Sequence, residues 1–346
     1  MRKKLAIVGI IVGLLILVGG VFTWRYYQLI YESNVPEELT QEHLLIPNGA
    51  TFEQVVDSLE YGGFLVTKDG FRDIAERMNY IQPEMRAGRY KIQPGWSNYE
   101  LIQHLRGGEQ ATVKLVLTNE RLPENVAAKA ARFITPDSVD IWALMQDRSY
   151  IEELGYTSET LMSLFIPNTY DFYWNSSPQT FLERMKKEHN RFWDSNNRRV
   201  KAKKKNMTPA EVYTLASIVE RETLRADEKK RMAGVYLNRL RDGMLLQADP
   251  TAVFARRDFG AKRVTWYHTK FDSPYNTYMY TGLPPGPITM SSISSIDAVL
   301  NAENHDYFYF CARGDGSGYH NFGKDLAQHN QNIKIYVRNL KKRGKR

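Results

Sequence analysis

An uncharged, apolar run near the N-terminus constrains this chain more than any other feature of its sequence. The run covers residues 5–22 and follows a short cationic segment. In helical conformation it would rise about 27 Å, which is enough to cross the hydrocarbon core of a bilayer. Trp24 follows at the far end, where aromatic side chains favour the membrane–water interface. We therefore predict a cytoplasmic tail over residues 1–4 and a single transmembrane anchor over residues 5–24.

A cleaved signal peptide is the alternative interpretation of the same run. Signal peptides usually have a shorter apolar part and end at a site of the A-x-A type, and no such site follows here. The cationic start of an uncleaved anchor predicts that the N-terminus lies in the cytoplasm. Almost everything after residue 27 would then lie outside the membrane, on its other side.

The overall composition is that of a globular protein with a basic surface. The 346 residues are 42% hydrophobic and 25% charged, with a net charge of +8 that favours an anionic surface or polymer. The densest basic run, residues 198–205, has no nucleic-acid-reading element beside it, so no nucleic acid is predicted as a partner. We expect a solvated basic loop there, with contact to lipid or an anionic polymer as the alternative. The single cysteine, Cys311, excludes an internal disulfide and a multi-cysteine zinc site.

A repeated unit follows a polar linker that we predict over residues 25–39. Thr51 and Ser97 each stand in a pattern of glycine turn, hydroxyl cap, short amphipathic helix and glycine stop, and the two copies are offset by 46 residues. Gln54 in the first copy and Glu100 in the second would complete a capping box. Each copy therefore predicts a short strand followed by a helix, a unit that binds a ligand or braces a neighbouring domain.

The stretch from Thr208 to Leu224 predicts an amphipathic helix that carries a candidate acid. Thr208 can cap this helix, and Glu211 would complete a capping box. Glu220 falls at the edge of an apolar stripe, with small residues one turn before it, which leaves room for a ligand. Burial there would raise its pKa, as a general acid requires. An ordinary solvated glutamate is the alternative.

Loops rich in polar and aromatic side chains follow this helix. Carboxylates and amides bind sugar hydroxyls, and aromatic faces stack on pyranose rings. The side chains that form such a set with Glu220 are Asn238, Gln247, Asp249, Tyr275, Asn276, Tyr278 and His320. The chain has no phosphate-binding loop, zinc-protease motif or nucleophile elbow, so neither a cofactor nor a metal is predicted.

A second carboxylate, which ordinary glycosidases use, is harder to find. Glu222 is a poor choice, because residues two apart on a helix point away from each other. Asp249 is the only plausible partner, and its N-cap-like setting would keep it ionised. A single protonated Glu220 is enough if the nucleophile belongs to the substrate.

Six separate stretches make the sequence recognisable. They are residues 215–223 (LASIVERET), 235–240 (VYLNRL), 246–251 (LQADPT), 273–278 (SPYNTY), 282–288 (GLPPGPI) and 318–322 (GYHNF). In this order they resemble the MltG/YceG-like family of membrane-anchored endolytic murein transglycosylases, and the resemblance covers nearly the whole chain. It implies an α+β fold with the transmembrane helix, a small LysM-like α/β module over residues 40–115 and a larger catalytic domain over residues 116–346.

The resemblance also implies an activity. Members cleave the β-1,4 bond between N-acetylmuramic acid and N-acetylglucosamine in nascent glycan strands and leave 1,6-anhydro-muramic ends. By this analogy Glu220 protonates the leaving oxygen and then helps the muramic C6 hydroxyl attack C1. Ser217 and Thr251 lie in the matching stretches and join the expected substrate-binding residues. The implied partners are peptidoglycan strands, lipid of the bacterial inner membrane and, as candidates, peptidoglycan synthases, with the catalytic domain in the periplasm.

The chain also departs from the family pattern. Met162-Ser163 replaces the usual E-G, Asn168 replaces the Asp of a P-D-T-Y turn, and Met290-Ser291-Ser292 replaces N-P-G after G-P-I. These departures concern the shape of the groove. Two other hypotheses stay open: a non-catalytic glycan-binding scaffold, and a hydrolase in which Asp249 activates water.

Overall fold

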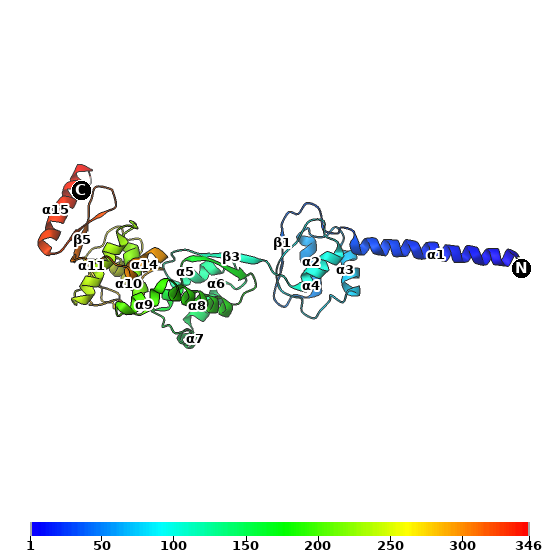
Figure 1. Cartoon of the computed structure of the whole chain (residues 1–346), viewed down its shortest axis with the longest axis horizontal. Helices are drawn as coiled ribbons and strands as arrows, with labels where there is room; N and C mark the ends of the chain where they lie inside the picture. The colour runs from blue at the N-terminus through cyan, green and yellow to red at the C-terminus, as the bar shows by residue number, and fades with distance from the viewer. Residues whose placement is uncertain (1, 345–346) are drawn as a thin grey trace. The chain divides into compact units, whose positions relative to one another are not determined.

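The computed structural model describes residues 2–344. Met1, the first residue of the predicted cytoplasmic tail, and residues 345–346, at the end of the predicted catalytic domain, lie outside the described residues. The fold is mixed α+β, as the sequence predicted (Figure 1). The chain divides into two compact units. The first comprises the residues up to Lys114 with 133–135 and 171–176, and the second comprises residues 115–132, 136–170 and those from Ser177 onward.

Helix α1 (Arg2–Tyr31) contains the apolar run. Among the described residues, its segment Ala6–Tyr31 is the one helix that is long and apolar enough to cross a membrane, and its most apolar part is not buried against the protein. It is therefore compatible with the predicted anchor. The helix continues beyond residue 24, where the anchor was expected to end, and residues 25–31 are helical rather than linker.

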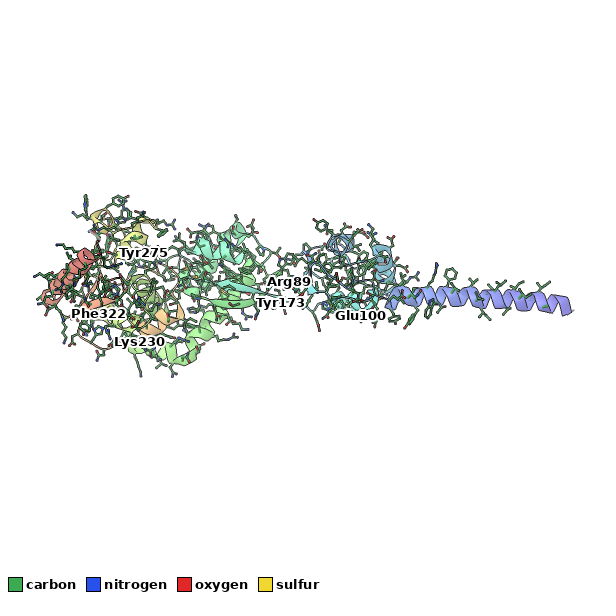
Figure 2. All side chains as sticks on the ribbon, turned by 90° about the horizontal axis from the view of Figure 1, so that it is seen from above. Arg89, Glu100, Tyr173, Lys230, Tyr275 and Phe322 are labelled. Carbon is green, nitrogen blue, oxygen red and sulfur yellow. The ribbon has the colours of Figure 1, made fainter. Side chains whose placement is uncertain are left out.

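Two short strand–helix units follow α1 in the first compact unit. Its elements are β1 (His43–Ile46), α2 (Phe52–Tyr61), α3 (Lys68–Arg77), β2 (Gly88–Lys91) and α4 (Asn98–Gly107). Both predicted capping boxes are present, at Thr51 and at Ser97, where the partner is Glu100 (Figure 2). The strands pair antiparallel with Ile46 opposite Gly88, so the two copies share one sheet. That this unit is LysM-like stays a prediction.

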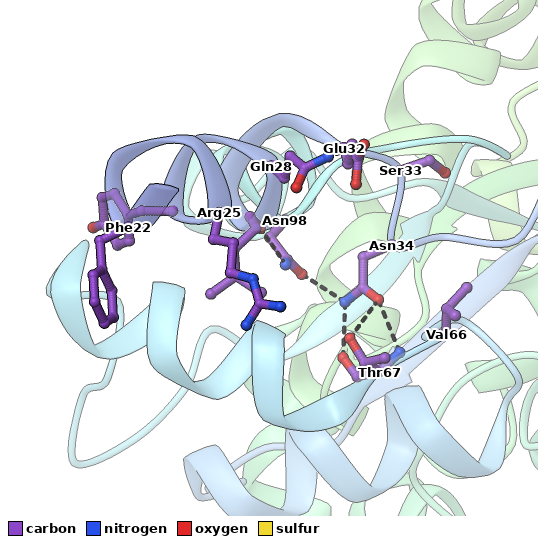
Figure 3. A pocket seen from close by; sticks show the side chains of 11 residues that line it. Phe22, Arg25, Gln28, Glu32, Ser33, Asn34, Val66, Thr67 and Asn98 are labelled. Carbon is purple, nitrogen blue, oxygen red and sulfur yellow. Dashed lines mark hydrogen bonds between the residues drawn. The ribbon is translucent and has the colours of Figure 1, made fainter. Parts of the chain in front are cut away.

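A buried amide network fixes the end of α1 to this unit. The Asn98 side chain donates a 2.8 Å hydrogen bond to the carbonyl oxygen of Leu29 in α1. Asn34 Nδ2 donates to Asn98 Oδ1 at 2.7 Å and to the carbonyl oxygen of Thr67 at 2.8 Å (Figure 3). Both asparagines are buried, and their polar atoms are satisfied. The last turn of α1 is therefore part of the folded unit.

The second unit is built on helix α10 (Pro209–Glu222). Its apolar face packs against α11 (Lys229–Arg241) and α14 (Ile293–Leu300) in one buried core. Two-stranded sheets join β3 to β4 and β5 to β6. The remaining elements of the described chain are β3 (Thr112–Leu117), α5 (Pro123–Ala130), α6 (Ser138–Gln146), α7 (Arg148–Glu153), η1 (Leu161–Leu164), β4 (Asn168–Tyr173), α8 (Pro178–Asp194), η2 (Ser195–Asn197), α9 (Arg198–Lys204), α12 (Asp249–Arg256), α13 (Trp266–Thr269), β5 (Tyr309–Ala312), β6 (His320–Gly323) and α15 (Leu326–Lys342).

The prediction of a solvated basic loop over residues 198–205 was wrong. Most of this run forms helix α9. Its first residue, Arg198, is buried and pairs with Asp297 of α14 through a 2.8 Å contact between Nε and Oδ1. The ion pair gives the run a tertiary partner, which charge density alone did not reveal.

Candidate active site

Helix α10 carries two glutamates in its last turn. The predicted capping box fixes the start of the helix. The Thr208 hydroxyl accepts a 3.2 Å hydrogen bond from the backbone N–H of Glu211. In return, the Glu211 carboxylate accepts a 2.7 Å hydrogen bond from the backbone N–H of Thr208. The helix ends at Glu222. Because residues two apart on a helix point in different directions, Glu220 and Glu222 meet separate sets of side chains.

Glu220 is held by several hydrogen-bond donors. Its Oε1 accepts a 2.9 Å bond from Asn119 Nδ2. Its Oε2 accepts a 3.0 Å bond from Lys229 Nζ and further bonds from the hydroxyls of Ser292 and Ser295. The side chains of Glu220 and Lys229 are only 14% and 8% exposed. The loop before α5, the start of α11 and the start of α14 therefore converge on this carboxylate.

These contacts hold the pKa of Glu220 below its ordinary value. Burial raises this pKa, but the hydrogen bonds from Ser292, Ser295 and Lys229 together outweigh burial. Burial raises the pKa of Glu220 as expected, but the net shift is downward, because the site supplies hydrogen-bond donors as well as desolvation. The lowered pKa favours the ionised form of Glu220, which accepts the hydrogen bonds of these donors.

Glu222 lies in the opposite kind of environment. Its Oε1 accepts a 2.7 Å hydrogen bond from the hydroxyl of Tyr236, which is fully buried. Burial raises the pKa of Glu222 to about 7; the Tyr236 hydrogen bond and Arg239 oppose this rise, and Asp249 adds to it. A carboxyl group that titrates near neutrality can donate a proton and take one back, as acid–base catalysis requires.

Asp249 and Tyr278, two of the predicted substrate-binding residues, lie on the Glu222 side. The Tyr278 hydroxyl donates a 2.5 Å hydrogen bond to Asp249 Oδ1. Burial, the Asp249 carboxylate and Glu222 all raise the pKa of Tyr278, so this hydroxyl keeps its proton. Asp249 opens helix α12 and is exposed, so its carboxylate is open to a ligand.

Four other predicted residues use their polar groups to hold loops near α10. Ser217 Oγ accepts a 3.0 Å hydrogen bond from the backbone N–H of Ile288. Asn276 donates to three backbone carbonyl oxygens at 2.7–3.2 Å. Asn238 and Thr251 likewise donate to backbone carbonyl oxygens. All four side chains are buried, so they would act on a substrate through the loops that they fix.

The last three predicted residues lie in different settings. Gln247 is exposed and has a positive φ of 50°. His320 Nδ1 lies 2.9 Å from Glu228 Oε2 in a largely buried pair. Tyr275, which is labelled in Figure 2, packs against Phe254, and their ring centroids are 4.9 Å apart. Tyr275 also lines a pocket.

This pocket has a volume of about 380 Å³ and lies within the second unit. Trp142, Phe254 and Tyr275 supply aromatic faces, while Arg121 and Glu159 supply charge. Burial and the nearby Glu159 raise the pKa of Tyr275 to about 12, so its hydroxyl is a neutral donor at pH 7. Aromatic faces beside a few polar groups are suited to a carbohydrate.

Comparison with known proteins decides the family. The sequence profile described as the YceG-like family matches residues 44–335, which is most of the chain. The chain belongs to the YceG-like family. The resemblance found in the six sequence stretches is thereby confirmed.

This YceG-like chain is similar to proteins named endolytic murein transglycosylase. It is 27% identical to the one from Bacillus subtilis (strain 168) over 341 residues, which cover 93% of this chain and 91% of that protein. It is 26% identical to the one from Streptococcus pneumoniae serotype 2 (strain D39) over 354 residues, and spans 62% of that longer protein. A crystal structure of a YceG-like protein from Listeria monocytogenes matches with a TM-score of 0.56 and 27% identity, and covers 84% of this chain and 97% of that one.

Sequence reasoning missed several residues of the candidate site. Ser292 lies in one of the noted departures from the family pattern, which was the only signal for it. Asn119 and Lys229 reach Glu220 only through tertiary folding. Within residues 2–344 no group of three or more His, Cys, Asp or Glu side chains is arranged to hold a metal ion. That the protein needs no cofactor stays a prediction.

Proposed function

We propose that the chain is a membrane-anchored endolytic transglycosylase of peptidoglycan. It cleaves the β-1,4 bond between N-acetylmuramic acid and N-acetylglucosamine within nascent strands and leaves 1,6-anhydro-muramic ends. Family membership and the names of the bacterial relatives support this reaction class. The observation that supports the choice of acid is Glu222, whose carboxyl group accepts a 2.7 Å hydrogen bond from the buried Tyr236 and whose pKa is raised by burial to about 7.

We assign the acid and base roles to Glu222. The protonated carboxyl group donates its proton to the glycosidic oxygen as the bond from this oxygen to muramic C1 breaks. The resulting carboxylate then accepts the proton of the muramic C6 hydroxyl as O6 bonds to C1. The proton returns to Glu222 and no water is consumed. One titrating carboxyl group is therefore sufficient.

Asp249 is a suitable neighbour for this acid. Its exposed carboxylate helps to raise the pKa of Glu222, and it would stabilise positive charge that develops at muramic C1. A hydrolase that uses Asp249 to activate water is the rival within the same site. The two reactions leave different ends, since hydrolysis gives a reducing sugar.

The assignment of the acid to Glu220 stays a prediction, and the opposite pKa shifts of the two glutamates support Glu222 as the alternative that we propose. Asn119, Lys229 and Ser292 all donate to Glu220, which suits a residue that fixes loops. We therefore propose that Glu220 positions the segments around the end of α10 while Glu222 carries the proton.

The other sequence-based assignments become proposals of two kinds. Gln247, Tyr275, Tyr278 and His320 are proposed to contact the glycan directly, together with Asp249. The buried loop-holding residues are proposed to act indirectly; they are Ser217, Asn238, Thr251 and Asn276.

The regions outside the catalytic domain are proposed to deliver it to its substrate. Helix α1 spans the inner membrane with the N-terminus in the cytoplasm, and the LysM-like module over residues 40–115 recruits strands. The catalytic domain over residues 116–346 would work in the periplasm or its equivalent. Membrane lipid and peptidoglycan synthases are proposed neighbours.

The test is a digest of purified peptidoglycan by the detergent-solubilised full chain, with the products identified by mass spectrometry. Products with anhydro-muramic ends are the expected result. Reducing ends would assign the reaction to the Asp249 hydrolase. Strand binding without any product would assign the chain to the second candidate function, a non-catalytic scaffold of the cell-wall machinery.

A further inference from the structure

The loop between β3 and α5 holds Arg121 in a defined position at the aromatic pocket. Asn119, two residues earlier, donates to Glu220, and the carbonyl oxygen of Glu120 accepts a 2.9 Å bond from the segment before α14. The Arg121 guanidinium lies over the ring of Phe259, 4.6 Å from its centroid. Contacts on both sides therefore fix the loop, and the guanidinium is partly immobilised before any ligand arrives.

Arg121 has no acidic partner among residues 2–344, where neither an ion pair nor a hydrogen bond involves its guanidinium. The charged group that acts on it is a second cation, Arg221 of α10, and burial together with Arg221 lowers the pKa of Arg121. The other arginine of the pocket, Arg257, is paired with Glu124 at 3.5 Å. An arginine that lines a pocket without an acidic partner, and that feels a second cation, favours an anionic ligand group.

We propose that Arg121, together with Arg221, binds a carboxylate carried by the muramic residue whose glycosidic bond is cut. This proposal rests on the proposed function, and it names the part of the substrate that this site recognises. A planar guanidinium pairs with a carboxylate through two parallel hydrogen bonds. Muramic acid differs from glucosamine by a lactyl ether at C3, so this is the charged group that distinguishes the two sugars.

Two parts of a peptidoglycan strand can supply this carboxylate. In peptide-free strands it is the lactyl carboxylate itself. In peptide-bearing strands the lactyl group is an amide, and the stem peptide supplies carboxylates instead. Strands of N-acetylglucosamine alone carry neither group.

The position of Arg221 links this site to the reaction. It stands between Glu220 and Glu222 in the last turn of α10. A carboxylate held by Arg121 would place the sugar that bears it in the pocket, with the ring against Trp142 and Tyr275. The sugar would then lie close to the end of α10, where Asn119 of the same loop contacts Glu220. C1, which is attacked, and C3, which carries the lactyl group, belong to the same ring, so binding of one orients the other.

The test compares the full chain with Arg121→Gln and Arg121→Lys on two substrates, peptide-free strands and peptide-bearing strands. KM and kcat are measured for cleavage, and strand binding is measured separately by co-sedimentation. Arg191→Gln, which removes an exposed arginine of α8, serves as the charge-matched control. Thermal unfolding of each variant reports whether it is folded.

We expect Arg121→Gln to raise KM, and to weaken strand binding, about tenfold or more on one of the two substrates, as removal of a charged hydrogen-bond donor does. Arg121→Lys should recover part of the loss, and Arg191→Gln should behave as wild type.

A loss confined to peptide-free strands identifies the lactyl carboxylate as the ligand, and a loss confined to peptide-bearing strands identifies a carboxylate of the stem peptide. Unchanged binding and KM on both substrates, in folded variants, would overturn the proposal. Binding that depends on Arg121 without cleavage would overturn the proposed reaction and keep the carboxylate site.

Discussion

Glu220 and Glu222 stand two residues apart on α10, and their pKa values are shifted in opposite directions. That of Glu220 is lowered, because hydrogen bonds from two serines and a lysine outweigh its burial. That of Glu222 is raised to about 7, because burial outweighs its hydrogen bond from Tyr236. The helix turns about 200° between them, so each carboxylate meets a different part of the protein. A single turn of helix thus holds one group that stays charged and one that can exchange a proton.

The first prediction separates these two groups. Glu222→Gln cannot donate a proton and should lower kcat for anhydro-product formation by about 10²–10⁴-fold, the usual contribution of a general acid. Glu220→Gln keeps the size of the side chain but replaces one acceptor oxygen with an amide donor; because Glu220 is proposed to position loops rather than to carry the proton, this variant should lower kcat much less. The measurement is product formation by the two folded variants. The reverse order of losses would restore Glu220 as the acid.

The second prediction concerns the pH dependence of catalysis. The proposed acid must be protonated in the free enzyme, so kcat/KM should fall as the pH rises through about 7, the pKa of Glu222. The measurement is the rate of anhydro-product formation at constant ionic strength between pH 5 and 9. A rate that stays flat across neutrality would contradict the assignment.

The third prediction concerns stability, where the sign follows from the raised pKa. Folded Glu222 holds its proton more tightly than the unfolded chain does, so its contribution is present at low pH and is lost as the pH rises from about 4.5 to about 7. At 1.36 kcal/mol per pKa unit, the loss is about 3 kcal/mol. Urea unfolding of wild type and Glu222→Gln at pH 5 and pH 8 would measure it. The difference between the two proteins should depend on pH in this window; a constant difference would contradict the raised pKa.

The fourth prediction concerns the ion pair between Lys229 and Glu220. Lys229→Met leaves a largely buried carboxylate without its cation and should lower the free energy of unfolding by about 3–5 kcal/mol. The double variant Lys229→Met with Glu220→Gln should recover part of this loss, because no unpaired charge remains. The coupling energy from the four proteins is the readout. Additive effects would show that the two groups do not stabilise each other.

The fifth prediction concerns Ser217 and the proline-rich loop of residues 282–288. Ser217→Ala leaves the buried N–H of Ile288 without its acceptor, at a cost of about 1–3 kcal/mol. Hydrogen exchange at Ile288 should accelerate, while exchange at the α10 cap near Thr208 should not change. Equal acceleration at both places would indicate a general loss of stability.

Local sequence signals predicted the parts of this fold that depend on local contacts. The caps at Thr51, Ser97 and Thr208 each need only a residue three positions away, and all three are present in the structure. The 46-residue offset likewise placed two similar strand–helix units, because each unit is defined within its own short stretch of chain.

The electrostatics of the candidate site could not be predicted in this way. Periodicity correctly indicated that Glu220 and Glu222 point apart, but it could not show what lies on each side. Lys229 and Ser292 lower the pKa of one glutamate, and Tyr236 and Asp249 surround the other, all from elements that only tertiary packing brings to α10.

The amide network around Asn98 determines how the proposed membrane anchor can move. Residues 23–31 extend α1 by about 14 Å beyond the apolar run, and Asn98 then bonds the helix to the folded unit. Within the described residues, no flexible linker separates α1 from the folded unit that follows it. A tilt or rotation of α1 would therefore turn this proposed LysM-like module as well. If α1 spans the membrane as proposed, the module would be confined to a shallow layer above the lipid. It would sample glycan while it is being polymerised at the bilayer surface, and older wall material further out would be beyond its reach.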